Sequence, residues 1–243
     1  MRILTFAKRN MKEILRDPLN LSFMFGFPVV LLLLLSAIQA NIPVRMFEIA
    51  HLAPGVMVFG LAFMTLFSAT VIAKDRMSSF MHRLYTTPMT PVDFILGYTL
   101  PLIPIAVMEC AVTYLAAIPL GLTPSVNLLL SALFMIPISM LYIGLGLLCG
   151  SIFNDKQVGG ICGALLTNVS AWLSGIWFDL DLVGGAFRQF AELLPFVHAV
   201  EMERAVVAGN LSGAFPHLLW VLGYALAVLM LAVFAFLRRM KRQ

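Results

Sequence analysis

The chain has 243 residues, of which 61% are hydrophobic and only 12% charged, and its mean hydropathy is +0.96. Soluble domains carry about 25% charged residues, so this chain has too few charges to cover a surface exposed to water. The composition therefore predicts a membrane protein. Six spans of about 20 residues would use most of the chain and leave no room for a soluble catalytic domain. The chemistry that drives the protein is expected on another chain.

The N-terminal segment, residues 2–17, is predicted to be an amphipathic helix on the membrane surface. At about 100° per residue, its apolar residues fall on one side of the helix and its charged residues on the other. The apolar residues are Ile3, Leu4, Ala7, Met11, Ile14 and Leu15. Asp17-Pro18 should end this helix, because the residue before proline is disfavoured in the α conformation. Two interpretations stay open, an anchor on anionic lipid and a docking element for a cytoplasmic partner.

Six segments that are nearly free of charge are predicted to be transmembrane helices. They cover about residues 20–40, 50–73, 94–120, 127–152, 158–178 and 215–237. Each can cross about 30 Å of hydrocarbon at about 1.5 Å per residue. Five prolines within them predict kinks: Pro28, Pro54, Pro101, Pro104 and Pro137. The sequence thus predicts an all-α integral membrane fold with one transmembrane domain over residues 1–243.

The placement of basic residues predicts the orientation of the chain. Of the 16 lysines and arginines, only Arg45, Arg188 and Arg204 fall on one side of the predicted spans. The positive-inside rule then places both termini in the cytoplasm. Topology therefore accounts for the basic composition, and no nucleic-acid partner is expected. No signal peptide is expected either, because the first apolar segment is too long for one, so the chain should remain a multi-pass protein of the cell membrane.

The loop from Lys74 to Asp93 is predicted to contain a short amphipathic helix over residues 76–87. Four apolar residues have the i, i+3, i+4, i+7 spacing: Met77, Phe80, Met81 and Leu84. Thr87-Pro88 and Thr90-Pro91 should close it. A cytoplasmic helix tied to spans at both ends could transmit the movement of a partner into the bundle. A solvated connector is the alternative.

Two features lie inside the predicted spans. Glu109 is the only acid well within one, where a charge costs about 2.5–3.5 kcal/mol. We expect it to face protein or a wet cavity, either on the translocation path or in a structural hydrogen bond. The pairs Gly146/Gly150 and Gly159/Gly163 permit close helix packing, with dimerisation as the second interpretation.

The long predicted external loop, residues 179–214, should contain two helical pieces. Pro195 separates them, and Gly209-Asn210 is expected to end the second. Five of the twelve acidic residues lie here: Asp179, Asp181, Glu192, Glu201 and Glu203. The two pieces form either an external gate or a structural lid.

Residue patterns for catalysis or metal binding are missing from the sequence. The cysteines Cys110, Cys149 and Cys162 have no CxxC spacing, and the histidines no HExxH spacing. There is no GxSxG elbow and no GxxxxGK[ST] loop. No metal or cofactor is therefore expected in this chain. An intramembrane enzyme is disfavoured, and so is an ion-coupled carrier, which would need more intramembrane acids than Glu109.

Several modest motifs follow one another over about residues 5–240. They are Lys8-Arg9-Asn10-x-Lys12-Glu13-x-x-Arg16-Asp17-Pro18, Leu52-Ala53-Pro54-Gly55-Val56, Asp75-Arg76 to Arg83-Leu84-x-x-x-Pro88, and Leu173-Ser174-Gly175 followed by Leu194-Pro195-Phe196-x-His198. In this order and spacing they resemble the membrane subunit of type-2 ATP-binding-cassette (ABC) exporters, of the drug- and antibiotic-export branch. One departure is that Trp177-Phe178 leads to Asp179, where many relatives have proline.

The resemblance implies a six-span permease that pairs with itself and with two copies of a separate ATPase, which binds ATP and Mg. The N-terminal helix would be the connecting helix, with Arg9, Lys12, Glu13, Arg16 and Asp17. The first cytoplasmic loop would be the coupling helix, seated in a groove of the ATPase, with Asp75, Arg76, Met77, Phe80, Arg83 and Leu84. The last external loop would form re-entrant half-helices.

Together, these features predict the permease subunit of an ATP-driven exporter. The expected substrate is hydrophobic or amphipathic and drug-like, moved outward across the cell membrane. Alternatives are an ABC exporter of a lipid-linked or polysaccharide substrate, and, further off, an intramembrane enzyme or an ion-coupled carrier.

Overall fold

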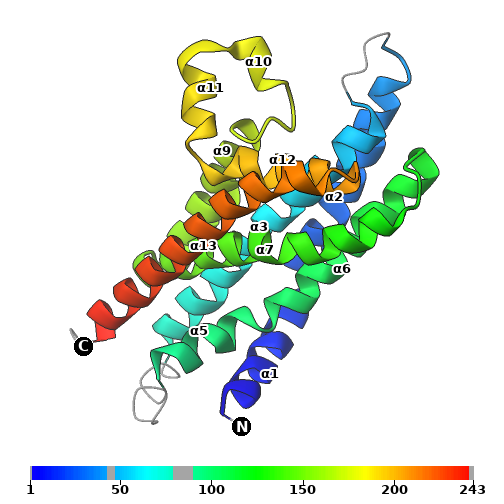
Figure 1. The fold of residues 1–243 in the computed structure, drawn as a ribbon. Helices are drawn as coiled ribbons and strands as arrows, with labels where there is room; N and C mark the ends of the chain where they lie inside the picture. Colours follow the sequence, from blue (N-terminus) through cyan, green and yellow to red (C-terminus); the bar gives the residue numbers. More distant parts are fainter. Residues whose placement is uncertain (1, 43–46, 79–89, 241–243) are drawn as a thin grey trace.

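The structure is a computed structural model that describes residues 2–42, 47–78 and 90–240, and this part of the chain is helical without strands. Long helices run side by side as a bundle (Figure 1). Both termini lie at one end, called here the terminal end. The short helices α10 (Leu180–Val183) and α11 (Gly185–Glu192) lie at the other, called here the loop end.

Asp17 divides the first two helices, α1 (Arg2–Leu15) and α2 (Pro18–Gln39). Its side chain accepts a hydrogen bond from the backbone N–H of Asn20 at 3.2 Å, which caps α2. Pro18 occupies the first turn of α2, where no N–H is needed. Asp17 therefore belongs to the start of α2 and not, as predicted, to the N-terminal helix.

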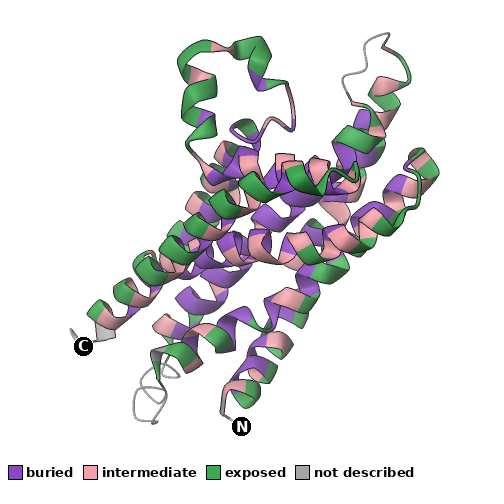
Figure 2. Cartoon of the chain, viewed as in Figure 1, coloured by how far each residue is buried: buried purple, intermediate pink, exposed green. Residues whose placement is uncertain are grey.

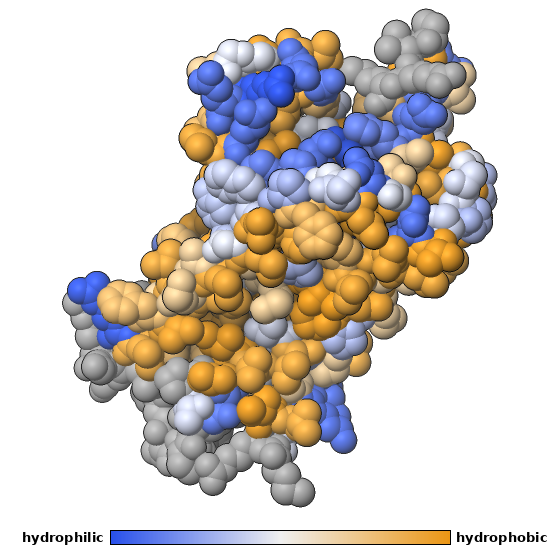
Figure 3. Space-filling model, viewed as in Figure 1, coloured by the Kyte–Doolittle hydropathy of each residue, from blue (hydrophilic) through white to orange (hydrophobic). Residues whose placement is uncertain are grey.

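Within the described residues, five segments are long and apolar enough to span a membrane. They are α2, α3 (Ile49–Met77), Val92–Leu120, α7 (Val126–Ile152) and α13 (Leu211–Met240), of which α13 qualifies up to Arg238. The central helix is α3, which contacts α2, α7 and most of the other helices. Figure 2 shows the buried centre and the exposed outer faces, and Figure 3 a hydrophobic band between two more hydrophilic ends. The chain is a multi-pass membrane protein.

The predicted span over residues 94–120 is divided into three helical pieces. These are α5 (Pro91–Thr99), α6 (Leu102–Ala117) and the short 3₁₀ helix η1 (Ile118–Leu120). Thr90 and Asp93 form a capping box that begins α5. Pro101 lies between α5 and α6. The helix is interrupted there because proline has no N–H for the next helical hydrogen bond. Of the five prolines expected to cause kinks, it alone separates two helices.

The predicted span over residues 158–178 is not one α-helix, so the prediction of six continuous spans is not confirmed. Helix α8 (Asp155–Val158) leads into a π-helix, η2 (Gly159–Leu166), which continues as α9 (Thr167–Trp172). Thr167 Oγ1 donates to the Cys162 carbonyl at 2.8 Å, across the wider turn. Three glycines in η2 remove side-chain crowding there, and a π segment of this kind interrupts the α-helical pattern.

The long loop contains a third helix, α12 (Pro195–Val207), which packs against α3, α7 and α13. Pro195 is its first residue, and therefore begins α12 as well as separating it from α11. The predicted stop at Gly209-Asn210 is confirmed. Gly209 has φ +78°, and the Asn210 N–H donates to the Ala205 carbonyl at 2.8 Å.

Two glycines of α7 allow it to pack closely on α3. A Cβ at Gly150 would lie 2.7 Å from the Ala69 carbonyl oxygen and 2.9 Å from Ala69 Cα. A Cβ at Gly146 would overlap Ser68 Oγ. In the second glycine pair, Gly163 lies against the side chain of Leu66, whereas nothing lies within 4 Å of a Cβ at Gly159.

Candidate functional site

At the terminal end, Arg9 joins α1 to the last turn of α3. Its Nη1 and Nη2 donate to the two carboxylate oxygens of Asp75 at 2.6 and 2.7 Å. Tyr98 Oη of α5 donates to the same carboxylate at 2.7 Å. The Asp75 side chain is only 5% exposed. Bidentate charge-assisted pairs are strong hydrogen bonds, so three helices meet at one buried carboxylate. We call Arg9, Asp75 and Tyr98 the terminal junction.

Neighbouring residues of α1 complete the contact with α5. The buried Asn10 donates from Nδ2 to the Gly97 carbonyl at 2.9 Å. The Phe6 ring lies edge-on to Tyr98, with ring centroids 4.9 Å apart. A Cβ at Gly97 would overlap the Phe6 ring, so the small residue permits this packing. The sequence did not indicate that Phe6 and Asn10 contact α5. Phe6 was not assigned to the apolar arc, and Asn10 is polar.

The apolar arc predicted for α1 is only partly buried. Ala7 and Ile14 are buried against the bundle, whereas Leu4 and Leu15 are 69% and 57% exposed. The predicted connecting-helix residues Lys12, Glu13 and Arg16 are also exposed. Packing against α5 therefore uses a narrower face than the arc, which leaves two leucines and the charged residues for the membrane surface or a partner.

Arg76 links the last turn of α3 to the end of α7. Its Nη1 donates to the carbonyls of Gly150 at 2.6 Å and Phe153 at 3.1 Å. These carbonyls lie at the C-terminus of α7, where a basic side chain satisfies groups without a helical partner. Asp75, Arg76 and the exposed Met77 thus end α3, whereas the prediction begins a separate helix at residue 76. Phe80, Arg83, Leu84 and the rest of that predicted helix lie outside the described residues.

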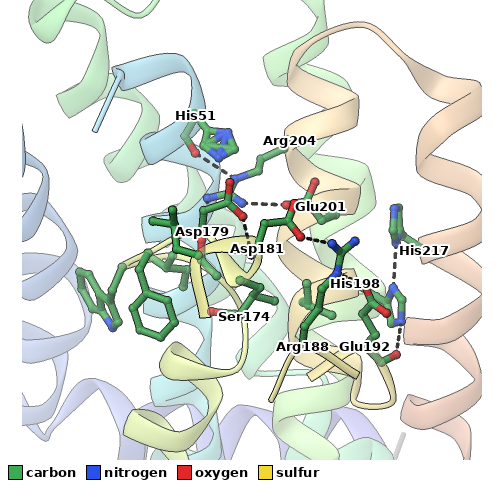
Figure 4. Close-up of a pocket in the computed structure, with 17 residues that line it drawn as sticks. His51, Ser174, Asp179, Asp181, Arg188, Glu192, His198, Glu201, Arg204 and His217 are labelled. Atoms are coloured by element: carbon green, nitrogen blue, oxygen red, sulfur yellow. Dashed lines mark hydrogen bonds and ion pairs between the residues drawn. The ribbon is translucent and has the colours of Figure 1, made fainter. Parts of the chain in front are cut away.

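A cavity of about 750 Å³ lies at the loop end. Its wall combines the first turn of α3, residues 174–182, and parts of α11, α12 and α13 (Figure 4). Arg204 of α12 closes one side. It donates to the His51 carbonyl at 3.2 Å, to the Gly175 carbonyl at 3.1 Å and to Glu201 at 2.7 Å. The Ser174-Gly175 motif is therefore part of the cavity wall, with Gly175 at φ +70°.

Two histidines connect α12 to α13 at the edge of this cavity. The Nδ1 atoms of His198 and His217 lie 2.8 Å apart, and His198 Nε2 lies 2.9 Å from the Glu192 carbonyl oxygen. Because a carbonyl only accepts, His198 Nε2 carries a proton, and a neutral His198 accepts from His217 at Nδ1. Tyr224 Oη also donates to the Leu193 carbonyl at 2.5 Å. The side chains of His198, His217 and Tyr224 thus hold the turn between α11 and α12 to α13.

Glu109 of α6 is fully buried and faces protein. Thr113 Oγ1 donates to its Oε1 at 3.2 Å. A Cβ at Gly60 of α3 would overlap this carboxylate and lie 2.9 Å from Pro28 of α2. Glu109 is not among the residues that line the loop-end cavity. Its role on a translocation path stays a prediction.

Glu203 of α12 is a second fully buried acid, although the sequence placed it in an external loop. Ser131 of α7 donates to its carboxylate, and Ser131 Oγ lies 2.8 Å from Tyr114 Oη of α6. Burial raises the pKa of Glu203 to about 8, and the hydrogen bond from Ser131 opposes this shift. Glu203 follows the apolar residues Phe196 and Val200 of α12 at helical spacing, which could have indicated that this acid faces the bundle.

Glu203→Gln is expected to make the stability of the protein less dependent on pH. A folded-state pKa of about 8, raised from 4.5, means that ionisation favours the unfolded chain. Stability should therefore fall as pH rises from about 4.5 to about 8 and stay low above that range. Thermal unfolding measured from pH 5 to 9 should show that the stability of Glu203→Gln, relative to that of the unmodified protein, increases with pH. Asp155→Asn, which changes an exposed carboxyl, should show no such increase. Equal dependence of stability on pH in Glu203→Gln and in the unmodified protein would contradict the prediction.

The described residues include no group of three or more metal-ligating side chains in suitable positions. The ABC-2 type transporter family matches residues 1–208, and the chain belongs to this family. It is thus the permease subunit of an ABC transporter, a class that acts with a cytoplasmic ABC ATPase. Comparison with curated proteins finds no match.

Proposed function

We propose that this permease exports a hydrophobic or amphipathic, drug-like substrate, with ATP and Mg bound by the partner ATPase. The terminal junction is the observation that carries this proposal. It lies at the start of the coupling helix predicted over residues 76–87, and it ties the last turn of α3 to α1 and α5. A movement of the ATPase that reaches this segment would therefore move three helices together.

The basic residues support an orientation with the terminal end in the cytoplasm. The described part of that end includes Lys8, Lys12, Arg16 and Lys74, while the loop end carries Arg188 and Arg204 beside a larger number of acids. This is the distribution that the positive-inside rule associates with a cytoplasmic terminal end. The loop-end cavity would then open outward.

The central helix offers a route between the two ends. Arg76 fixes the last turn of α3 to α7, and the first turn of α3 accepts a hydrogen bond from Arg204 of α12. Because packed helices shift as rigid elements, a displacement of α3 would reach α12 and the cavity. Closure of the ATPase on ATP would thus change the shape of the cavity.

Self-association is part of the proposal. One face of η2 and α9 is exposed although it belongs to an apolar segment, and it carries Gly160, Ala164 and Asn168. Small residues and a polar amide favour helix association within a membrane. We propose that a second permease chain covers this face.

Association with a cytoplasmic ABC ATPase of the same organism tests the function. We expect the two chains to purify as a complex whose mass contains two copies of each. Arg76→Glu should lower substrate-stimulated ATP hydrolysis about tenfold, since about 1.4 kcal/mol of coupling changes a rate by that factor. Arg238→Gln, near the C-terminus, should leave hydrolysis unchanged. In inverted membrane vesicles, ATP should drive uptake of an amphipathic dye.

Two results would contradict the proposal. One is a permease that purifies without the ATPase under conditions in which both chains are folded. The other is ATP-driven loss of the dye from inverted vesicles, which would mean import. Equal ATPase activity in Arg76→Glu and Arg238→Gln would remove α3 from the coupling route.

A further inference from the structure

The loop-end cavity carries more acidic than basic side chains. Four carboxylates and two guanidinium groups line it: those of Asp179, Asp181, Glu192, Glu201, Arg188 and Arg204. Arg188 contacts both Asp181 and Glu192, and Arg204 contacts Glu201. With histidine counted as neutral, acidic groups therefore exceed basic ones by two, and both arginines already have carboxylate partners. His51, His198 and His217 are the other titratable side chains of the wall.

Most of the exposed charged groups at the cavity are carboxylates. The Arg204 side chain is only 12% exposed, whereas that of its partner Glu201 is 41% exposed. Asp179 is exposed, and no ion pair to it is found in the described part of the chain. Its carboxylate accepts the Asp181 N–H at 3.0 Å, which leaves acceptor capacity for a ligand. Figure 4 shows Asp179 between residues from α3 and α12.

An aromatic wall adjoins Asp179. Trp177 and Phe178 both line the cavity and are half-buried. Trp177 lies edge-on to Phe59 at 5.5 Å between ring centroids, and Phe178 lies 6.2 Å from Phe187. These contacts hold the rings in place. Aromatic rings attract organic cations through their faces and also bind the apolar part of such a molecule.

We propose that the loop-end cavity binds organic cations that carry apolar rings. Asp179 supplies the counter-charge, and Trp177 and Phe178 supply the apolar wall. A volume of about 750 Å³ is large enough for a drug-sized molecule. A bare metal ion is disfavoured, since the described residues offer no cluster of three ligating side chains. That these cations are also the transported substrate rests on the proposed export function, whereas the binding itself does not.

The test is equilibrium binding of radiolabelled tetraphenylphosphonium to the full chain in lipid nanodiscs, without ATPase or ATP. Empty nanodiscs give the background. Asp179→Asn should weaken binding about tenfold, while the asparagine can still cap α10. Trp177→Leu should weaken it several-fold. Asp155→Asn, an exposed carboxyl of α8 away from the cavity, should not change it. Unlabelled triphenylphosphine oxide, which has similar rings and no net charge, should compete far less than unlabelled tetraphenylphosphonium.

Equal binding by Asp179→Asn and Asp155→Asn would overturn the proposal, and so would equal competition by triphenylphosphine oxide and unlabelled tetraphenylphosphonium. This outcome is distinct from a failure of the export function. Charge-selective binding together with a missing ATPase complex would leave the cavity site standing and remove the exporter. ATP-driven dye transport without tetraphenylphosphonium binding would support the exporter and contradict the cation site in the cavity.

Discussion

Arg9→Gln is expected to uncouple ATP hydrolysis from transport and to lower the free energy of unfolding by about 3 kcal/mol. Breaking a buried ion pair costs about 3–5 kcal/mol, because the remaining charge is left without a partner. The lower figure applies because the Arg9 side chain is itself 33% exposed. Among the described residues, Asp75, at 5% exposed, would keep the side-chain hydrogen bond from Tyr98 alone. Thermal unfolding and substrate-stimulated ATPase activity of the complex measure the two effects.

A double-mutant comparison separates the pair from its individual residues. Asp75→Asn should be milder than Arg9→Gln, since it leaves no buried charge behind and the amide oxygen still accepts from Tyr98. The double variant Arg9→Gln/Asp75→Asn should be more stable than Arg9→Gln alone. Lys12→Gln, on the exposed face of the same helix, is the control. If Lys12→Gln loses as much coupling as Arg9→Gln, coupling depends on the positive charge of α1 and not on the contacts of the terminal junction.

Gly146→Val is expected to reduce the yield of folded protein sharply. Its side chain would overlap Ser68 Oγ and the Thr65 carbonyl oxygen on α3. Overpacking of a core costs about 1–3 kcal/mol, and more where the obstacle is backbone. Gly150→Ala should also destabilise, because its Cβ would lie 2.7 Å from a carbonyl oxygen of α3.

Gly159→Ala is the matched control, since nothing lies within 4 Å of the added Cβ. Its thermal unfolding should stay close to that of the unmodified protein. Equal losses for Gly146→Val and Gly159→Ala would show that the contact between α3 and α7 does not limit stability. A loss confined to Gly159→Ala would instead indicate that this residue lies in an interface between two chains.

Some features depend on composition and local backbone geometry, and these could be predicted from the sequence. The apolar segments identified a membrane protein, because a span needs about 20 apolar residues whatever it packs against. Asp17-Pro18 and Gly209-Asn210 marked helix ends, because proline and the left-handed glycine act within one turn. The order of the motifs led to the correct family.

The prediction was less successful where one helix depends on another. Residues 158–178 contain no charged side chain, like most of a typical span, so hydropathy could not show that Gly159–Leu166 forms a π-helix. Glu203 was counted with the external acids because it lies within residues 179–214, the predicted external loop, yet packing of α12 against α7 buries it. Hydropathy measures the average environment of a segment and does not specify the direction of one side chain.

The sequence by itself thus determined the class of protein, its family and most of its spanning segments. Only the tertiary structure decided that Arg9 and Asp75, 66 residues apart, form one ion pair with Tyr98. It also decided which glycines contact α3 and which acidic and aromatic residues share the loop-end cavity. The physical reason is that burial of apolar surface is non-directional and can be estimated from composition, whereas hydrogen bonds and close packing require specific atoms of distant segments to meet.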